Sequence, residues 1–306
     1  MSGLGEWGVP PALTARLAVD PVDAEWLRGL PSRASALAIR WNLRSDGEAC
    51  SGFNSAAWPV SDGEDCALVL KVSRPTWPIE PEVVALRAWD GHGAVECHAY
   101  SRHDNAVLLQ RLDANRSLDA DPDIDSACRA AASVLAELHR VTPPTGFRHL
   151  IVEAQSLADE IRHRSRGPLP APLTPRQVKQ AIDTWQGIEP EPTDRLLHND
   201  AHFLNVLATI DGEPSWRAID PYPFVGPVEI ELVPLLRNRW ADAAATGDAD
   251  RALRHRVDMM SEIIGGDPAR ARAFAQAAAV VNLLLLLPKE PDHSFVPPYT
   301  VIAGWG

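Results

Sequence analysis

Cysteine is scarce in this sequence of 306 residues, and its few occurrences suggest neither a metal site nor a redox pair. Cys50, Cys66, Cys97 and Cys128 stand 16, 31 and 31 positions apart, with no C-x-x-C pair and no His in metal-ligand spacing. Such sparse thiols do not build a disulfide framework of the secreted kind. We therefore expect a reduced, cytoplasmic protein.

Long apolar runs are also absent. The most apolar stretch, 277–287, is eleven residues long and contains Asn282, whereas a membrane span needs about 20 residues. This stretch predicts a buried helix, and no membrane partner is expected. The N-terminus lacks an apolar core behind basic residues, so a signal peptide is not indicated, and we expect the first dozen residues to be loosely held.

Positive charge is in deficit, because 29 Lys and Arg residues stand against 41 Asp and Glu residues and give a net charge of −12. A surface of this sign repels phosphate backbones, so nucleic acid is not expected as a partner. It attracts cationic ligands, although most acidic proteins use net charge only to stay in solution. A content of 45% hydrophobic and 23% charged residues excludes disorder.

Short runs of strand-forming residues fill the first third of the chain. They predict five strands, at 36–43, 54–60, 66–73, 94–100 and 106–112. Asp62-Gly63 predicts a tight hairpin between the second and third strands. A helix is predicted at 80–90, with Pro81 in its first turn and Gly91 just after its end. These patterns favour one five-stranded antiparallel sheet with one helix.

Helical spacing dominates the rest of the chain. Apolar residues recur every three to four positions, which predicts helices at 121–140, 151–163, 175–186, 229–243, 249–264 and 268–287. The change of pattern near Asp113 predicts an α+β protein with two lobes, 1–112 and 113–306. Ligand sites favour the boundary between two such lobes.

Lysine is rarer still than cysteine, because only three of the 29 basic residues are lysines. Lys71 stands out among them, since it lies in the apolar run 67–72, where a charge is costly unless an anion is near. A compact ammonium group suits phosphate oxygens, and Glu82 on the predicted helix is a candidate partner, with Glu80 as its competitor. The alternative is an edge-strand lysine whose charged end reaches water.

A second cluster of chemically useful residues begins at His198 and Asp200, continues with Asn205 five positions after the Asp, and ends at Asp220. Phosphoryl transfer from ATP needs a carboxylate that orients and deprotonates the attacking hydroxyl, together with oxygen ligands for Mg²⁺. Asp200 fits the first role, and Asn205 and Asp220 fit the second. Two alternatives remain: zinc bound by His198 and His202, although the glutamate of H-E-x-x-H is missing, or polar residues that only cap turns.

The order of these residues along the chain resembles that of the protein-kinase-like fold. The stretches 196–207, 218–221 and 231–238 are similar to the aminoglycoside and hydroxyurea phosphotransferase family. Upstream, 85–95 and 108–113 match that family's first-lobe helix and inter-lobe hinge, so the resemblance covers about 27–284. It implies a bilobal fold with a nucleotide-binding first lobe and a mostly helical second lobe.

For the nucleotide, the resemblance implies that Lys71 contacts the ATP phosphates and that Glu82 holds Lys71 in place. The backbone around Arg111 and Leu112 is implied to contact adenine. Asn205 and Asp220 are implied to hold magnesium.

For the acceptor, the resemblance implies that Asp200 is the base and that His198 orients the catalytic loop. The family phosphorylates a hydroxyl group on a small and often cationic molecule. Glu229 and Glu231 are candidates to meet the cationic groups of that acceptor.

Three departures from the family pattern stand out. The loop 47–55 is poor in glycine and carries Glu48, which leaves fewer amides to cradle phosphate. Asn199 and Ala201 replace the usual Gly and Leu, and Phe203-Leu204 is bulkier than usual. The C-terminal segment 288–306 does not match the family ending, and its aromatic and proline residues suggest packing or a partner contact.

The resemblance thus implies a cytoplasmic kinase that uses ATP and Mg²⁺ to phosphorylate an aminoglycoside such as streptomycin, and so confers resistance. The alternative acceptors are hydroxyurea and other small metabolites. A further alternative is a pseudokinase module that binds nucleotide without catalysis.

Overall fold

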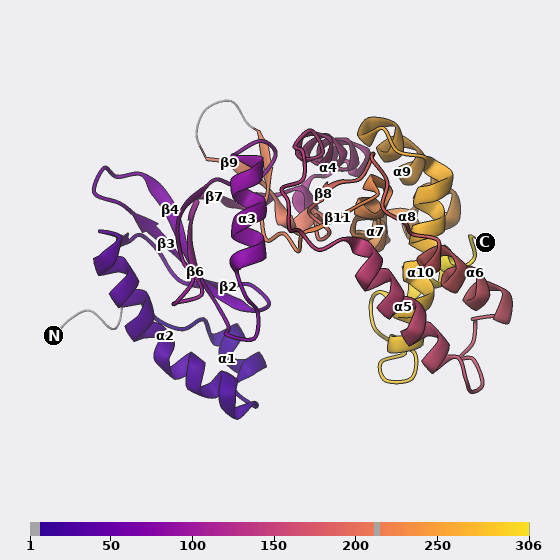
Figure 1. The fold of residues 1–306 in the computed structure, drawn as a ribbon, viewed down its shortest axis with the longest axis horizontal. Coiled ribbons are helices and arrows are strands. Elements are labelled where there is room, and N and C mark those ends of the chain that lie inside the picture. Colours follow the sequence, from indigo (N-terminus) through magenta and orange to yellow (C-terminus); the bar gives the residue numbers. More distant parts are fainter. Residues whose placement is uncertain (1–6, 211–214, 306) are drawn as a thin grey trace. The chain divides into compact units, whose positions relative to one another are not determined.

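The computed structural model describes residues 7–210 and 215–305, which fall into two compact units. The first unit ends at Asp113 and the second begins at Ala114, apart from a short stretch after Ala208 that belongs to the first unit. Each unit has its own secondary structure, labelled in Figure 1.

The first unit is a sheet covered by helices. Its elements are α1 (Pro11–Leu17), α2 (Pro21–Arg40), β1 (Arg44–Ser45), β2 (Cys50–Ser51), β3 (Ser55–Ser61), β4 (Ala67–Ser73), α3 (Glu80–Trp89), β5 (Cys97–Ser101) and β6 (Ala106–Gln110). The strands lie in the order β1-β3-β4-β6-β5, with β2 also paired to β3, and every pair is antiparallel. The predicted hairpin joins β3 to β4, and Asp65 rather than Gly63 takes the positive φ, at 61°.

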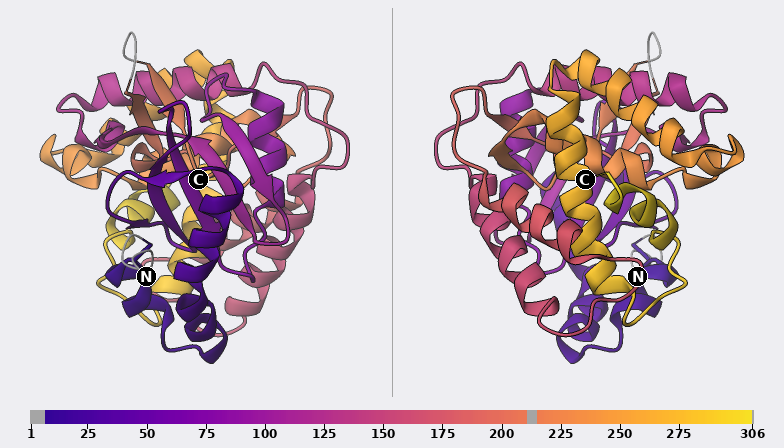
Figure 2. Two further views of the ribbon diagram at one scale, coloured as in Figure 1. Left: turned by 90° about the vertical axis from the view of Figure 1, so that its left-hand side faces the viewer. Right: turned by 90° about the vertical axis from the view of Figure 1, so that its right-hand side faces the viewer.

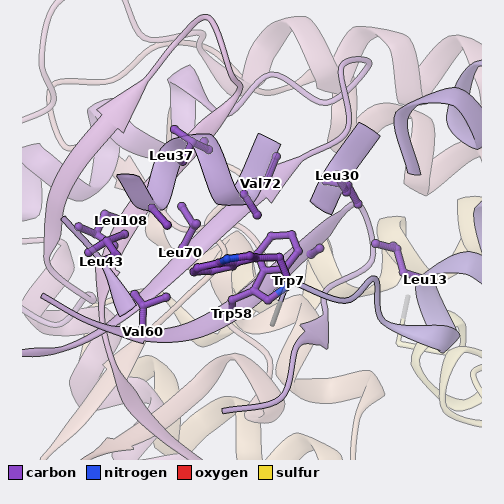
Figure 3. Packing of buried hydrophobic residues seen from close by; sticks show 14 of the residues in the cluster. Trp7, Leu13, Leu30, Leu37, Leu43, Trp58, Val60, Leu70, Val72 and Leu108 are labelled. Carbon is purple, nitrogen blue, oxygen red and sulfur yellow. The ribbon is translucent and has the colours of Figure 1, made fainter. Parts of the chain in front are cut away.

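Alternation along β4 decides which helix covers which face of this sheet. Leu68, Leu70 and Val72 are buried together with Trp58 of β3 and with apolar residues of α2, which therefore covers one face (Figure 3). Successive side chains of a strand point to opposite faces, so Lys71 projects to the other face, where α3 supplies its partner Glu82. Alternate residues of β4 therefore contribute to the apolar core on one face of the sheet and to the Lys71–Glu82 ion pair on the other.

Two helices at the N-terminus were not predicted. The expected strand at 36–43 is wrong, because most of that stretch is the last turn of α2. Gly29 and Pro31 disguise this helix in the sequence, but Trp26, Leu27, Leu30, Ala34 and Leu37 recur at helical spacing and form its buried stripe. The N-terminus is not loosely held where it is described: Trp7 is only 4% exposed and packs edge-on against Trp58 at 6.2 Å, while residues 1–6 lie outside the described part.

The second unit is mostly helical. Its elements are β7 (Leu112–Ser117, which begins at the border), the 3₁₀ helix η1 (Leu118–Ala120), α4 (Ile124–Leu138), α5 (Leu150–Arg164), α6 (Pro175–Gln186), β8 (Arg195–Leu197), η2 (Phe203–Asn205), β9 (Val206–Thr209), β10 (Trp216–Ala218), β11 (Phe224–Gly226), η3 (Val228–Leu232), α7 (Val233–Arg237), α8 (Trp240–Ala245), α9 (Ala249–Ile264), α10 (Pro268–Leu286) and α11 (Val296–Ala303). Helices α4, α5, α6, α9 and α10 match the prediction to within a few residues.

The expected helix at 229–243 is divided into three pieces, η3, α7 and α8. Pro234 cannot donate a backbone hydrogen bond and therefore stands in the first turn of a new helix. Arg239 has a left-handed φ of 53°, which ends the helical path before α8.

Helix α10 forms the centre of the second unit and packs against α6 and α11 (Figure 2, right-hand view). Among the described residues it is the one helix long and apolar enough to qualify as a membrane span by length and composition, with a mean hydropathy of 1.3. Of that window, 61% is buried within the fold, as in the core helix of a soluble protein. The buried helix predicted from the apolar run is therefore present.

Candidate active site

In the first unit, Lys71 and Glu82 form a buried ion pair. The Lys71 ammonium Nζ donates to both carboxylate oxygens of Glu82, at 2.9 and 2.8 Å. The two side chains are 9% and 6% exposed. Lys71 lies on a central strand, paired with Ala57 on one side and Val107 on the other, so the edge-strand alternative is wrong. Glu80, the competing partner, faces Arg102 instead at 3.2 Å.

The glycine-poor loop 47–55 is held by a side chain from α1. Arg16 donates from Nη2 to the carbonyl oxygens of Gly52 and Phe53, at 2.6 and 2.8 Å. Its guanidinium carbon also lies 5.0 Å from the centre of the Phe53 ring, a cation–π distance. A contact from outside the loop thus restrains this turn, whereas phosphate-binding loops generally depend on glycine for their shape.

The expected hinge residues Arg111 and Leu112 follow β6, and Leu112 begins β7, which belongs to a second sheet with β9 and β10. The Arg111 amide donates to the Ala67 carbonyl at 3.2 Å, and its guanidinium pairs with Asp46 at 2.6 Å. Leu112 is 7% exposed. Because the Arg111 amide is already used within the sheet, a contact from this segment to a nucleobase falls to its carbonyl groups or to Leu112.

In the second unit, the loop 198–205 after β8, which carries the candidate base Asp200 and is called the catalytic loop below, is fixed by the carboxylate of Glu231. That carboxylate accepts hydrogen bonds from the backbone amides of His198 and, at 2.9 Å, of Asn199. The His198 ring is fully buried, which lowers its pKa, and its Nδ1 accepts from the Asp200 amide at 3.3 Å. His198 and Glu231 therefore hold the backbone from which Asp200 projects.

The departure at Asn199 has a backbone explanation. Its φ is 61°, in the left-handed region that Gly adopts freely and that Asn tolerates better than most residues. Ala201 and Phe203 are fully buried, so they belong to the core beneath the loop, whereas Leu204 is 52% exposed. Of the four residues that differ from the family pattern, one therefore takes a backbone conformation suited to Gly, two are buried, and one is exposed.

Asp200, Asn205 and Asp220 are brought together by backbone contacts. The Asn205 side chain donates from Nδ2 to the Asp200 carbonyl at 3.0 Å and lies 3.5 Å from Asp200 Oδ2. Strands β9 and β10 pair next to them, and the Ile219 amide donates to the Asn205 carbonyl at 2.9 Å. This arrangement puts Asp220 beside Asn205, with a left-handed φ of 57° of its own.

Two opposing effects act on the pKa of the partly exposed Asp200 carboxyl group: desolvation and the charge of an arginine. Desolvation raises the pKa of Asp200 to about 6, against the opposing effect of the Arg237 guanidinium, while the carboxylates of Asp220 and Glu231 raise it further. Desolvation also lowers the pKa of His202 to about 4, so this ring is neutral near pH 7. A neutral His202 and a carboxylate at Asp200 suit the acceptance of a proton from a hydroxyl group.

The donor atoms of Asn205 and Asp220 fit a magnesium ion better than zinc. Amide and carboxylate oxygens are the ligands that Mg²⁺ takes, and this ion commonly has only one or two protein ligands beside phosphate and water. The hydrogen bond from Asn205 Nδ2 fixes which end of the amide is oxygen. Within residues 7–210 and 215–305, no group of three His, Cys, Asp or Glu side chains is arranged to hold a metal ion.

The carboxylates of Glu229 and Glu231, expected to meet the acceptor, have partners inside the fold. Glu231 is fully buried under the catalytic loop. Glu229 is 7% exposed and accepts from the Asp267 amide at 3.1 Å, at the start of α10. Gly266 permits this approach, because a Cβ there would lie 3.0 Å from the Glu229 side chain. Both residues thus stabilise the loop and helix ends rather than present free charge.

A cavity of about 210 Å³ opens beside the catalytic loop within the second unit. Its polar lining is Glu153, Asn199, Tyr222, Arg237 and Asn282. The rest of the wall is apolar and comes from α5, α6, η3, α7 and α10. Sequence reasoning missed Glu153 and Arg237. The one available signal was Arg237 as a charge at the end of the apolar run 232–236.

Residues 40–283 match the family described as aminoglycoside/hydroxyurea antibiotic resistance kinase. The chain belongs to this family. A streptomycin 6-kinase of Streptomyces glaucescens is 36% identical over 259 residues, which are 85% of this chain and 83% of that protein. A hydroxyurea phosphotransferase of Kitasatospora aureofaciens is 37% identical over 264 residues, 85% of this chain and 74% of that protein.

Solved structures place this antibiotic resistance kinase in the protein-kinase-like fold. A choline/ethanolamine kinase family protein from Mesorhizobium loti aligns with a TM-score of 0.58 at 16% identity, over 96% of this chain and 92% of that chain. The predicted family and fold class are thereby confirmed, although the sheet of the first unit has six strands in its described part, including the two-residue strands β1 and β2, and not the five predicted. The chain is a phosphotransferase that acts on a small molecule.

Proposed function

We propose that this kinase transfers the γ-phosphoryl group of ATP, with Mg²⁺, to a hydroxyl group of a streptomycin-like aminoglycoside and so inactivates it. The observation that carries the proposal is the arrangement of Asp200, Asn205 and Asp220 on one rigid loop and hairpin. Relatives that phosphorylate streptomycin and hydroxyurea support the acceptor class. The reaction uses cytoplasmic ATP, so we propose that the enzyme acts in the cytoplasm.

The chain's own residues divide the work of the reaction. Asp200 orients the acceptor hydroxyl and takes its proton, while Lys71, held by Glu82, offers its ammonium group to the phosphates. Asn205 and Asp220 hold the magnesium ion, which when bound draws charge off the phosphate oxygens. Such a reaction depends mainly on positioning and charge stabilisation, and both the loop and the Lys71–Glu82 pair are rigidly held.

The cavity beside Asn199 and Arg237 is our candidate for the acceptor pocket. Asn199, from the loop that carries Asp200, lines this cavity, and the Glu153 carboxylate offers a partner for a cationic group. Glu153 thereby takes over the substrate role that the sequence suggested for Glu229 and Glu231. The net charge of −12 favours the approach of a cation.

Cavity size favours hydroxyurea as the second candidate acceptor. Pockets for drug-sized ligands have volumes of roughly 300 to 1,000 Å³. The volume of about 210 Å³ accommodates a single ring of an aminoglycoside or the whole of hydroxyurea. The kcat/KM values for streptomycin and hydroxyurea therefore indicate which of the two is the better acceptor.

ADP release by purified protein with Mg-ATP tests the proposal against streptomycin, other aminoglycosides, hydroxyurea and no acceptor. We expect stimulation by streptomycin and a fall in kcat of about 10²- to 10⁴-fold in Asp200→Asn, because a general base contributes that much. Nucleotide binding by this variant, measured by calorimetry, should equal that of the wild type.

Two results would contradict the proposal. Near wild-type turnover by Asp200→Asn would remove Asp200 from the role of base. Nucleotide binding without turnover of any acceptor on the panel would instead support the pseudokinase alternative.

A further inference from the structure

Arg237, the last residue of α7, lies between the catalytic loop and the C-terminal segment. Its Nη2 is 3.5 Å from Asp200 Oδ1, and its Nη1 donates to the Tyr299 hydroxyl at 3.4 Å. The guanidinium carbon lies 5.3 Å from the centre of the Phe295 ring, within cation–π range. One side chain thus contacts the candidate base and two aromatic residues more than fifty positions further along the chain.

The aromatic residues belong to a part of the fold that is itself well anchored. Phe295 and Tyr299 pack edge-to-face at 6.1 Å, and Tyr299 is only 2% exposed. Helix α11, which carries Tyr299, packs against α10 and α7 (Figure 2, right-hand view). The segment 288–306, whose role the sequence left open between packing and a partner contact, therefore packs within the second unit where it is described.

The backbone after Arg237 is also fixed. Arg256 of α9 is only 2% exposed and points at this turn, where it lies 3.4 Å from the Asn238 carbonyl and 3.3 Å from the Arg239 carbonyl. Arg256 thereby restrains the backbone at the end of α7, while Phe295 and Tyr299 contact the side chain of Arg237. Fixing an arginine in one rotamer costs conformational entropy, and the contacts with its side chain and with the backbone after it offset that cost.

We propose that Arg237 is a positioning residue for Asp200 and that Phe295 and Tyr299 of the C-terminal segment hold Arg237 in place. The inference rests on the proposed function, in which Asp200 is the base. Arg237 lies 3.5 Å from Oδ1 of Asp200, whereas Oδ2 faces Asn205 Nδ2 at 3.5 Å and His202 Nε2 at 3.9 Å. The Asp200 side chain is 40% exposed, so without these neighbours it would sample other rotamers.

The test compares the kcat and KM of Arg237→Gln, Arg237→Lys, Phe295→Leu and the double variant Arg237→Gln/Phe295→Leu with the acceptor that the wild type turns over best. We expect Arg237→Gln to lower kcat by about tenfold to hundredfold, because a misplaced catalytic group costs that much. The KM for ATP should stay within about twofold of the wild type. Arg237→Lys should recover part of the loss, since it keeps the charge but not the planar fork.

Phe295→Leu distinguishes positioning from a general loss of packing. We expect it to lower kcat by a smaller factor, and we expect no further loss when it is added to Arg237→Gln, because Phe295 acts through Arg237. The matched control is Arg254→Gln. Arg254 makes the same kind of contact with Trp305, at 5.1 Å, and pairs with Asp250, away from Asp200. Its kcat should equal that of the wild type.

Each outcome decides between the two proposals. Equal kcat in Arg237→Gln and the wild type, or additive losses in the double variant, would overturn the positioning role while the proposed function stands. An equal loss in Arg254→Gln would reduce the effect to loosening of the C-terminal segment. A wild type that turns over no acceptor would overturn the proposed function, and the inference with it.

Discussion

Lys71 and Glu82 show how one buried ion pair acquires a definite partner. Helix α3 offers two carboxylates two positions apart, but only Glu82 lies on the side of the helix that faces β4. Glu80 points to Arg102 and has a side chain 45% exposed. The two glutamates therefore provide a matched comparison of a buried and an exposed partner on the same helix.

Replacing Glu82 by Gln should destabilise the first unit far more than replacing Glu80 by Gln. Glu82→Gln removes the carboxylate that accepts both hydrogen bonds from the buried Lys71 ammonium, and breaking such a buried pair costs about 3–5 kcal/mol, whereas an exposed pair contributes about 0–1 kcal/mol. Urea unfolding of both variants measures the difference in the free energy of unfolding. Equal free energies of unfolding would show that water reaches Lys71.

The helix α1 has a function that its seven residues do not suggest by themselves. Through Arg16 it holds the carbonyl groups at the tip of loop 47–55, which has few glycines. A loop with fewer glycines has fewer conformations to lose, and an external contact selects one of them. Ordering of this loop would then depend on an element outside the sheet.

Arg16→Ala should raise the KM for ATP by a few fold and leave the KM for the acceptor unchanged. Loss of two hydrogen bonds and a cation–π contact at an exposed site is worth about 1 kcal/mol. Steady-state kinetics with each substrate varied in turn measures both constants. Equal KM values for ATP in the variant and the wild type would mean that the loop keeps its path without α1.

The periodicity of apolar residues predicted most helices and strands. It failed where glycine, proline or tertiary contacts determine where an element begins or ends. Helices α6 and α9 were predicted with their observed bounds, because both have a clear stripe and a capping residue. Helix α2 was missed since Gly29 and Pro31 interrupt its pattern, and the segment 229–243 was predicted whole although Arg239 breaks it. Short strands such as β1 and β2 leave no pattern to detect.

The candidate site, like the secondary structure, could be predicted from the sequence only where its residues lie close together in the chain. Residues only a few positions apart in the chain, such as Asp200 and Asn205, could be singled out by their spacing. Arg237 could not, because its partners stand 37 and 62 positions away and only the fold brings them together. Glu231 was singled out because it is acidic, but its hydrogen bonds with the backbone amides of His198 and Asn199 could not be predicted, because these residues stand 33 and 32 positions away.

Net charge is a property of the entire chain, and −12 is large for a protein of this size. Such a charge raises the local concentration of a cationic acceptor and has no such effect on a neutral one. Screening by salt acts over about 10 Å at 0.1 M ionic strength. Dependence on salt therefore reports whether the acceptor is a cation.

Raising the ionic strength from about 0.02 to 0.2 M should increase the KM for streptomycin by a few fold and leave the KM for hydroxyurea unchanged. The neutral compound serves as the control, because any effect of salt on the nucleotide acts on both assays alike. Equal shifts for the two acceptors would exclude long-range attraction as a contributor to recognition.

Both ends of the chain lie outside the region that matches the family, 40–283, and yet both complete a core. Trp7 and α2 cover one face of the sheet, while Phe295 and Tyr299 close around Arg237. A gene shortened to the matched region would encode a protein with bare tryptophan and leucine side chains on the first unit and a loosened arginine on the second. Sequence similarity is therefore a poor guide to where this protein can be cut for expression.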